Sequence, residues 1–261
     1  MVKLMTSKNK KFCVLLCSIL IIFLYFCILK KTYMTTINLK QEHNSTLQRK
    51  RYKYNLMPKL LFATMDLIAG KKHSLPKAKL LEILASIPYR EWEIKKYFAI
   101  TRHFRNKNKV DESKTIIEWS REAQDNEYIH LLVIHEKMKE DGIKDTWYLS
   151  SFVVFLAVCS YVFMSKIFRI FSLKSALYFN AQFEDHAEHV YAEFVSEHPE
   201  LETQLLTNEL VKKYADVDNW ADVFRRISLD ERDHRNNSFH FCGRPEFVLK
   251  YEGMPVVYAI L

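Results

Sequence analysis

The sequence predicts an all-α fold in which four long helices form a bundle. Only four Gly and six Pro occur in 261 residues, and 49% of the residues are hydrophobic. This composition favours long helices around one sizeable core over a turn-rich β fold. One short pattern also occurs twice, as Glu127-x-x-His130 and Glu231-x-x-His234. Residues three apart lie on one face of a helix, so each copy can direct a carboxylate and an imidazole to a common point.

A lone glutamate precedes each copy of the pattern, Glu82 before the first and Glu184 before the second. The chain between successive positions is long enough for the rest of one helix, a turn and part of the next helix. Four carboxylates and two imidazoles from four helices are the ligand set of a dinuclear iron or manganese site in a ferritin-like bundle. The sequence therefore predicts such a site, with Glu82, Glu127, His130, Glu184, Glu231 and His234 as its ligands.

The individual helices are predicted from the spacing of apolar residues and from stop signals. Residues 56–69 are amphipathic and end at Gly70, a natural stop. The predicted ligand-bearing helices cover residues 80–88 with a continuation to 104 after Pro88, then 116–138, 152–198 and 220–235. A short accessory helix covers residues 205–214.

The first apolar segment predicts a membrane anchor. Residues 12–29 are eighteen residues without a charge, with lysines on both sides. This length can cross a bilayer as a helix. A cleaved signal peptide is the alternative, but the segment ends in Phe-Cys-Ile-Leu without a small-residue cleavage site, so a retained anchor is favoured. Positive charge on both sides leaves its orientation open.

A second apolar segment covers residues 152–171 and is interrupted only by Lys166 and Arg169. It is a second membrane span, a core helix, or a helix that lies flat in one leaflet with its basic residues at the headgroups. No Gly or Pro separates it from Glu184. A full span would bring that ligand close to lipid, so the flat arrangement is favoured.

These features divide the chain into four parts. A basic segment with the anchor (1–31) and a polar, basic linker (32–55) precede the helical bundle (56–239), and a tail (240–261) follows it. The formal net charge is +8, but the basic residues are spread among apolar ones rather than gathered in a stripe. An anionic membrane surface therefore fits better than nucleic acid.

The segments around the four ligand positions carry a family resemblance. They read Leu-Leu-Glu-Ile at 80–83, Asn-Glu-Tyr-Ile-His-Leu at 126–131, Phe-Glu-Asp-His-Ala at 183–187 and Asp-Glu-Arg-Asp-His-Arg at 230–235. In order, they resemble the Leu-Glu-Thr, Asn-Glu-Arg-Met-His-Leu, Leu-Glu-Glu-Glu-Ala and final Asp-Glu-x-x-His motifs of the alternative oxidases, which are membrane-bound di-iron quinol oxidases. Asp222-Val223-Phe224 looks more like the plastid terminal oxidase branch, so the branch stays open.

The resemblance implies a cyanide-resistant terminal oxidase of a respiratory electron-transport chain. Such a protein oxidises a quinol, for example ubiquinol or plastoquinol, and reduces dioxygen to water. Carboxylate and imidazole ligands suit iron that changes oxidation state and binds oxygen. The resemblance implies that the six predicted ligands hold two iron ions. Tyr191 matches the family tyrosine implicated in the redox chemistry. Asn126 and Asp230 match polar residues that support the ligands.

The quinol pocket is where the sequence departs from the family. Leu81 matches a residue that lines this pocket. The basic residue expected five positions before the first ligand is Lys77 rather than Arg, which keeps the charge but loses the planar fork. Ile83 replaces the threonine of Leu-Glu-Thr, and Ser228-Leu229 replaces Arg-Ala. These changes leave the metal ligands intact and the identity of the quinol open.

Other polar residues are predicted to be structural. Four histidines are expected on the surface or in ordinary hydrogen bonds, namely His135, His186, His189 and His240. Glu122, Glu188 and Glu193 are expected on solvated helix faces.

Two other functions share this ligand pattern. One is a different di-iron carboxylate enzyme, such as a hydroxylase of quinone biosynthesis, and the other is a non-enzymatic iron-binding bundle. For the oxidase, the sequence is consistent with a bacterial inner membrane or an organellar membrane, on either side of it. A homodimer is one assembly that such a chain could form.

Overall fold

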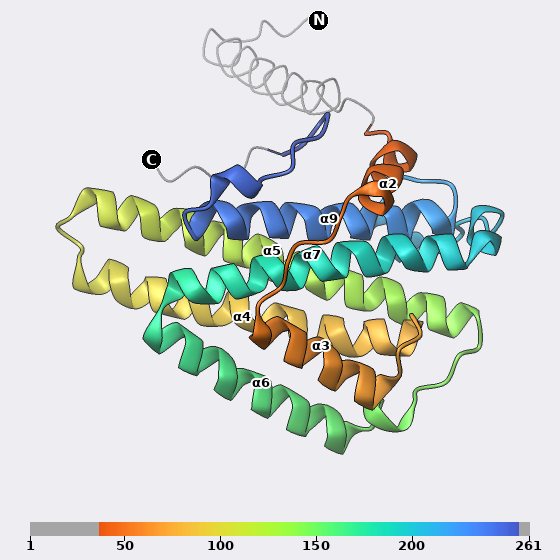
Figure 1. Ribbon diagram of the computed structural model, residues 1–261, viewed down its shortest axis with the longest axis horizontal. Coiled ribbons are helices and arrows are strands. Elements are labelled where there is room, and N and C mark those ends of the chain that lie inside the picture. Colours follow the sequence, from red (N-terminus) through yellow and green to blue (C-terminus); the bar gives the residue numbers. More distant parts are fainter. Residues whose placement is uncertain (1–36, 256–261) are drawn as a thin grey trace, which may run out of the picture. The chain divides into compact units, whose positions relative to one another are not determined.

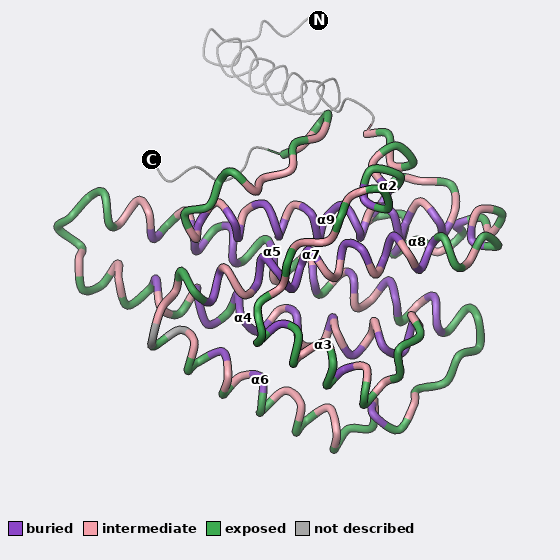
Figure 2. The backbone as a smooth tube through the Cα atoms, viewed as in Figure 1, coloured by how far each residue is buried: buried purple, intermediate pink, exposed green. Residues whose placement is uncertain are grey.

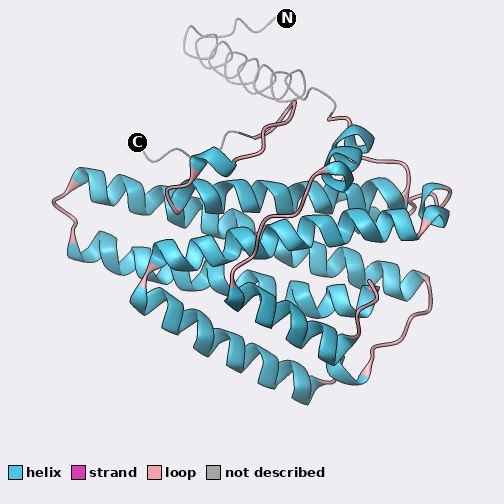
Figure 3. Cartoon of the chain, in the orientation of Figure 1, coloured by secondary structure: helices cyan, strands magenta, loops and turns pink. Residues whose placement is uncertain are grey.

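The computed structural model describes residues 37–255, apart from the side chains of Arg169 and Phe171. This part of the chain is helical, and its only β-type pairing is an isolated bridge between Leu205 and Asn219 (Figures 1 and 3). The helices are α2 (Leu39–Gln48), α3 (Leu56–Ala69), α4 (Leu75–Arg102), α5 (Lys107–Glu140), α6 (Ser151–Phe171), α7 (Leu173–Glu197), α8 (Glu209–Tyr214) and α9 (Trp220–Phe241). The predicted all-α fold is confirmed, and the predicted anchor at 12–29 lies outside the described residues.

Four long helices form the bundle. Helix α4 packs along α5, and α7 packs along α9, while α6 packs on α4 and α3 packs on α7 (Figure 1). Figure 2 shows that the long helices are buried on the sides that face one another, whereas α6 is largely exposed. The core therefore lies between α4, α5, α7 and α9, and the shorter helices cover it from outside.

Helix α4 runs through Pro88 without a break, so the interruption expected there is wrong. A proline inside a helix costs about 3 kcal/mol, because it removes one hydrogen bond and crowds the preceding turn. Packing on the following turn offsets this cost. Tyr89 lies edge-on to Trp119 of α5 at 5.3 Å between ring centroids, and Trp92 stacks on the same ring at 5.6 Å.

The single helix predicted for residues 152–198 is also wrong, because the chain breaks at Ser172. This residue has an extended backbone, with φ −161° and ψ 118°, and its Oγ accepts a hydrogen bond from the N–H of Ser175 at 3.2 Å. Serine is a preferred residue for such a helix start. The break separates α6, which lies outside the bundle, from α7, which carries Glu184 into the core.

The range predicted as a linker contains an ordered segment. After α2, residues 49–55 run across the outer side of α7 (Figure 1). The backbone N–H groups of Tyr52 and Asn55 donate to Asp185 Oδ2 and Gln182 Oε1 at 3.0 and 2.6 Å. Residues 39–55 are therefore part of the helical body rather than a free connection, because α7 offers acceptors that satisfy their backbone.

Glu188 of α7 is fully buried, which corrects its expected place on a solvated face. Its carboxylate accepts hydrogen bonds from Arg49 at 2.6 Å, Arg232 at 2.8 Å and Thr46 at 2.8 Å. Burial raises the pKa of Glu188, but Arg232 and Arg49 outweigh burial and hold that pKa below its usual value. The buried ion pairs therefore join α2 and residues 49–55 to both α7 and α9.

We expect Glu188→Ala to lower the free energy of unfolding by about 3–5 kcal/mol, because it leaves buried guanidinium groups without their carboxylate. The matched control is Glu193→Ala on the same helix. Glu193 pairs with Arg51 where both side chains are about one-third exposed, so its loss should cost about 1 kcal/mol or less. Urea unfolding of both variants measures the difference, and equal losses would contradict the structural role of Glu188.

Candidate metal centre

The six predicted ligands meet in the middle of the bundle. Glu82 comes from α4, Glu127 and His130 from α5, Glu184 from α7, and Glu231 and His234 from α9. None of them is more than 7% exposed. Each helix turns one face inward, and that face carries the ligand positions because residues three apart share it.

The donor atoms form two overlapping groups. One contains Glu82, Glu127, His130 and Glu231, and the other contains Glu127, Glu184, Glu231 and His234. Within each group the donor atoms all lie within 4.8 Å of one another. Because Glu127 and Glu231 belong to both groups, this arrangement can hold two metal ions that share two carboxylates.

Unpaired buried atoms test whether a metal pair fits. Among the described residues, seven buried donor atoms of these side chains have no hydrogen-bond partner: Glu82 Oε2, Glu127 Oε1 and Oε2, His130 Nδ1, Glu184 Oε2, Glu231 Oε1 and His234 Nδ1. His234 Nδ1 approaches Glu127 Oε1 at 2.9 Å, but only as a close charge contact without hydrogen-bond geometry. An unpaired buried polar atom costs about 1–3 kcal/mol. Two divalent cations would pair all seven atoms and balance the four carboxylates.

The crowding of buried carboxylates also shifts the pKa values of the candidate ligands. Burial, followed by the neighbouring carboxylates, raises the pKa of Glu184 well above its usual value, and burial raises that of Glu82 to about 8. For the imidazole of His234, burial lowers the pKa, but Glu127 outweighs burial and raises it well above 6.5. Carboxylates crowded in a dry core therefore favour any nearby positive charge.

Asp230 fixes the orientation of His130. Its Oδ2 lies 3.3 Å from His130 Nε2, and it accepts hydrogen bonds from Tyr214 at 2.6 Å and from Asn126 at 3.3 Å. Arg226 also bonds to the Asp230 carboxylate. With Nε2 held on this side, Nδ1 of His130 faces the metal donors. Asp230 thus contacts a ligand directly, and Asn126 acts through Asp230.

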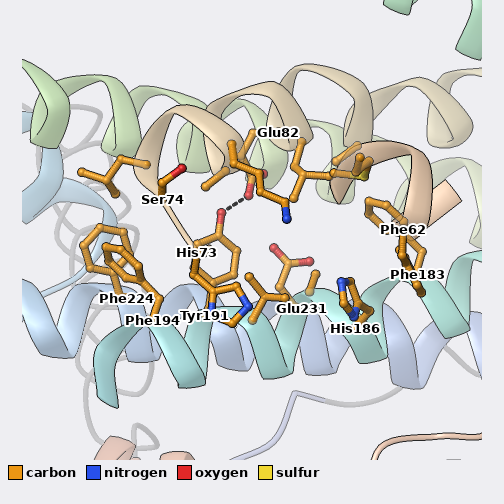
Figure 4. A pocket seen from close by; sticks show the side chains of 18 of the residues that line it. Phe62, His73, Ser74, Glu82, Phe183, His186, Tyr191, Phe194, Phe224 and Glu231 are labelled. Atoms are coloured by element: carbon orange, nitrogen blue, oxygen red, sulfur yellow. Dashed lines mark hydrogen bonds between the residues drawn. The ribbon is translucent and has the colours of Figure 1, made fainter. Parts of the chain in front are cut away.

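Two tyrosines bond to ligand glutamates. The hydroxyl of Tyr191 donates to Glu82 Oε1 (Figure 4), and the hydroxyl of Tyr89 donates to Glu184 Oε1 at 2.7 Å. Burial, and then Glu82, raises the pKa of Tyr191 well above its usual value, so Tyr191 keeps its proton.

The sequence interpretation missed Tyr89 and Tyr214. A signal for Tyr89 was present, because it follows Glu82 by seven residues, the same spacing that places Tyr191 on the face of Glu184. Tyr214 belongs to the short helix α8 and lies outside every ligand motif. Only the packing of α8 against α5 brings it to Asp230 and His130.

A narrow apolar cavity reaches the donor atoms from α3, α4 and α7 (Figure 4). Its lining includes Phe62, Met65, Leu81, Ala85, Phe183, Val190 and Phe194, and it ends at Glu82, Glu127, Glu231 and Tyr191. Both residues predicted for the quinol pocket, Leu81 and Lys77, line it. The ammonium group of Lys77 donates to Asp66 Oδ1 at 2.6 Å and to the carbonyl of Gly70 at 2.8 Å.

His186 also lines this cavity. Its ring stacks on Phe62 with 3.9 Å between centroids, and its Nδ1 lies 2.9 Å from Arg51 Nη1. Burial, followed by Arg51, lowers the pKa of His186 to about 3, so the ring is neutral at pH 7. It therefore offers the cavity an aromatic, uncharged surface.

A separate polar cavity of about 130 Å³ approaches the centre between α5 and α9. Asn126, Asp230, Asp233 and His234 are among its lining residues. The candidate centre thus lies between an apolar cavity on one side and a polar cavity on another.

A third acidic group does not resemble a metal site. Asp185, Glu188 and His189 lie close together on α7, but cationic and backbone partners already satisfy them. Arg235 donates to Asp185 at 2.8 Å, and His189 Nδ1 lies 2.7 Å from the carbonyl of Asp185. As predicted, His189 is an ordinary hydrogen-bonded histidine.

The alternative oxidase family model matches residues 29–242, a range that includes all six donor residues. The chain belongs to the alternative oxidase family. Alternative oxidases are membrane-associated di-iron quinol oxidases, and the buried Glu and His groups described above fit the iron binding of that family. No curated protein matches the chain. The predicted family is confirmed, while the choice between its branches stays a prediction.

We expect the purified protein to bind two iron ions per chain and Glu127→Ala to lose most of both, because Glu127 belongs to both donor groups. The control is Glu118→Ala, an exposed position on the same helix, which should keep the wild-type content. Elemental analysis after anaerobic loading with ferrous iron gives the measurement. Unchanged iron in Glu127→Ala would argue against the centre.

Proposed function

We propose that this protein is a membrane-bound quinol oxidase that passes electrons from a quinol to dioxygen and forms water. The observation that carries the proposal is the apolar cavity that ends at the two overlapping donor groups. A lipid-soluble reductant can reach the centre through a cavity with apolar walls. The family points to the same reaction.

The cavity offers a quinol two kinds of contact. Its apolar walls, including Phe62, Leu81 and Phe183, suit the ring and the start of an isoprenoid chain. Polar groups at specific points can orient the hydroxyls, namely Lys77 with its partner Asp66 on one wall and Tyr191 at the inner end. Because Lys77 is a point charge, it does not impose the fixed geometry that an arginine would.

The six ligand residues would hold two iron ions, and these would supply the capacity to bind dioxygen and exchange electrons. Each quinol gives two electrons and two protons, so two quinols reduce one dioxygen to two waters. The protein's own side chains hold the reactants in place and supply protons. Tyr191 lies at the inner end of the cavity with its hydroxyl bonded to Glu82, where it can pass a proton between quinol and centre. Polar residues such as Asn126 and Asp230 line the cavity beside His234, which suits the exit of product water.

Exposed apolar residues support the membrane location in this proposal. Among the described helices, α6 is long and apolar enough to cross a bilayer, with a mean hydropathy of 1.9 over Ser151–Phe168. Phe152, Phe155 and Phe163 of α6 are each more than 60% exposed, and Leu67 of α3 is 86% exposed. Both helices lie on the side of the bundle away from α9 (Figure 1). A monolayer of lipid against α3 and α6 would cover these side chains and lie beside the apolar cavity.

The reaction is tested with membranes that contain the protein. We expect oxygen consumption in the presence of cyanide when ubiquinol, menaquinol or plastoquinol is supplied, at a rate that differs among the three. Glu127→Ala should abolish it and Glu118→Ala should not. No uptake with any quinol, together with a hydroxylated quinone product, would instead support a biosynthetic hydroxylase.

Tyr191→Phe should lower kcat by about 10²-fold, the size expected when a proton-transferring group is lost. Iron content should stay at the wild-type value, because the phenyl ring still packs on Phe224 and Glu82 keeps its free oxygen. Stopped-flow oxygen consumption checks the rate. A variant that retains full activity would show that Tyr191 has only a packing role.

A further inference from the structure

Two tyrosines are arranged reciprocally around the donor groups. Tyr191 of α7 donates its hydrogen bond across the bundle to Glu82 of α4, and Tyr89 of α4 donates across the bundle to Glu184 of α7. Each tyrosine follows the ligand of its own helix by seven residues. The two glutamates that belong to only one donor group are therefore each held by a tyrosine from the facing helix.

The hydrogen bonds indicate which carboxylate oxygens of the ligand glutamates are available to bind a metal. In Glu82 and Glu184 the tyrosine occupies Oε1, while Oε2 is buried and has no hydrogen-bond partner. Glu127 differs, because both of its oxygens lack a partner and it belongs to both donor groups. The unpaired atoms thus distinguish Glu82 and Glu184, with one available oxygen each, from the shared ligand Glu127 with two. The other shared ligand, Glu231, has one unpaired oxygen, Oε1.

The position of Tyr89 is fixed by its surroundings. Its ring is fully buried and lies edge-on to Trp92 at 5.0 Å between centroids. Asn180 donates to the Tyr89 hydroxyl oxygen at 3.1 Å and also to Glu184 Oε1 at 2.9 Å. The same amide nitrogen also lies 3.1 Å from Ser238 Oγ, and the Tyr89 hydroxyl donates to Glu184 Oε1. Tyr89 and Asn180 therefore both hold the same carboxylate oxygen.

We propose that Tyr89 is a positioning residue that restricts Glu184 to one metal-binding oxygen and so keeps a coordination position open for dioxygen. A glutamate that binds through both oxygens takes two positions on a metal, and the hydrogen bonds that Tyr89 and Asn180 donate to Glu184 Oε1 compete with metal binding at that oxygen. On the other side of the centre, Tyr191 donates to one oxygen of Glu82. The proposal rests on the proposed function, because it assigns the open position to the reduction of dioxygen.

The test uses the iron-loaded full chain with Tyr89→Phe, which removes the hydroxyl and keeps the ring. Near-infrared magnetic circular dichroism of the diferrous protein reports the number of ligands on each ferrous ion. We expect the bands of one iron to shift to a higher ligand number at unchanged iron content. With dioxygen, kcat should fall about tenfold or more, while the KM for quinol stays the same because Tyr89 does not line the apolar cavity.

Two further variants make the result specific. Asn180→Ala removes the second hold on Glu184 Oε1 and should shift the same bands in the same direction, by a smaller amount. Tyr148→Phe changes a buried tyrosine of the short helical turn Trp147–Leu149, outside the donor groups, and its spectrum should match that of the wild type. If Tyr89→Phe does not fold, the spectrum of Asn180→Ala alone tests the proposal. A shift of the bands would support it, and an unchanged spectrum would contradict it.

Several outcomes would overturn the inference. They are an unchanged diferrous spectrum in Tyr89→Phe and Asn180→Ala, a loss of iron from a folded Tyr89→Phe protein, or a rise in the quinol KM with kcat unchanged. The spectra are recorded without quinol. A wild-type protein that binds iron and shows the expected variant spectra, but oxidises no quinol, would contradict the proposed function and leave the role of Tyr89 at Glu184 intact.

Discussion

The burial of four carboxylates and two imidazoles at one point is the constraint on which the rest of the structure depends. Several kcal/mol are lost for each ion taken out of water unless an opposite charge and hydrogen bonds replace the solvent. The unpaired atoms of Glu127, Glu231 and their neighbours all face this point, so the remaining requirement is for cations. The surrounding tyrosines and Asp230 satisfy only the atoms that face away from it. Metal binding and the stability of the core are therefore coupled.

The same helices carry a second set of buried charges on another face. Successive residues of a helix point about 100° apart, so Asp185 points away from the direction of Glu184, and Arg232 away from that of Glu231. Asp185 and Arg232 lie under α2 and residues 49–55, where they meet partners such as Tyr52 and Glu42. The outer network fixes how α7 lies against α9. That relative position in turn sets how Glu184 of α7 lies relative to Glu231 and His234 of α9, so the N-terminal segment contributes to the geometry of the centre without touching it.

Two cavities of different polarity reach the centre from different sides. The apolar cavity is bordered by α3, whose exposed leucines are suited to lipid, and the polar cavity opens between α5 and α9. A substrate that dissolves in the bilayer and a product that dissolves in water can therefore use different sides of one bundle. The break at Ser172 makes this possible, because it lets the apolar helix α6 stay outside while α7 remains in the core.

The sequence by itself determined the helical class, the bounds of α3 with its stop at Gly70, and the six residues that meet in the core. These features are local, since helix periodicity places residues three apart on one face whatever the rest of the chain does. Tertiary structure alone decided that α4 continues through Pro88, that Glu188 is buried, and that Tyr214 reaches Asp230. Each of these depends on a partner far away in the sequence, namely Trp119, Arg49 with Arg232, and the packing of α8 on α5. A pattern along one helix states which face is polar, but only the assembled bundle supplies the charge or ring that makes burial favourable.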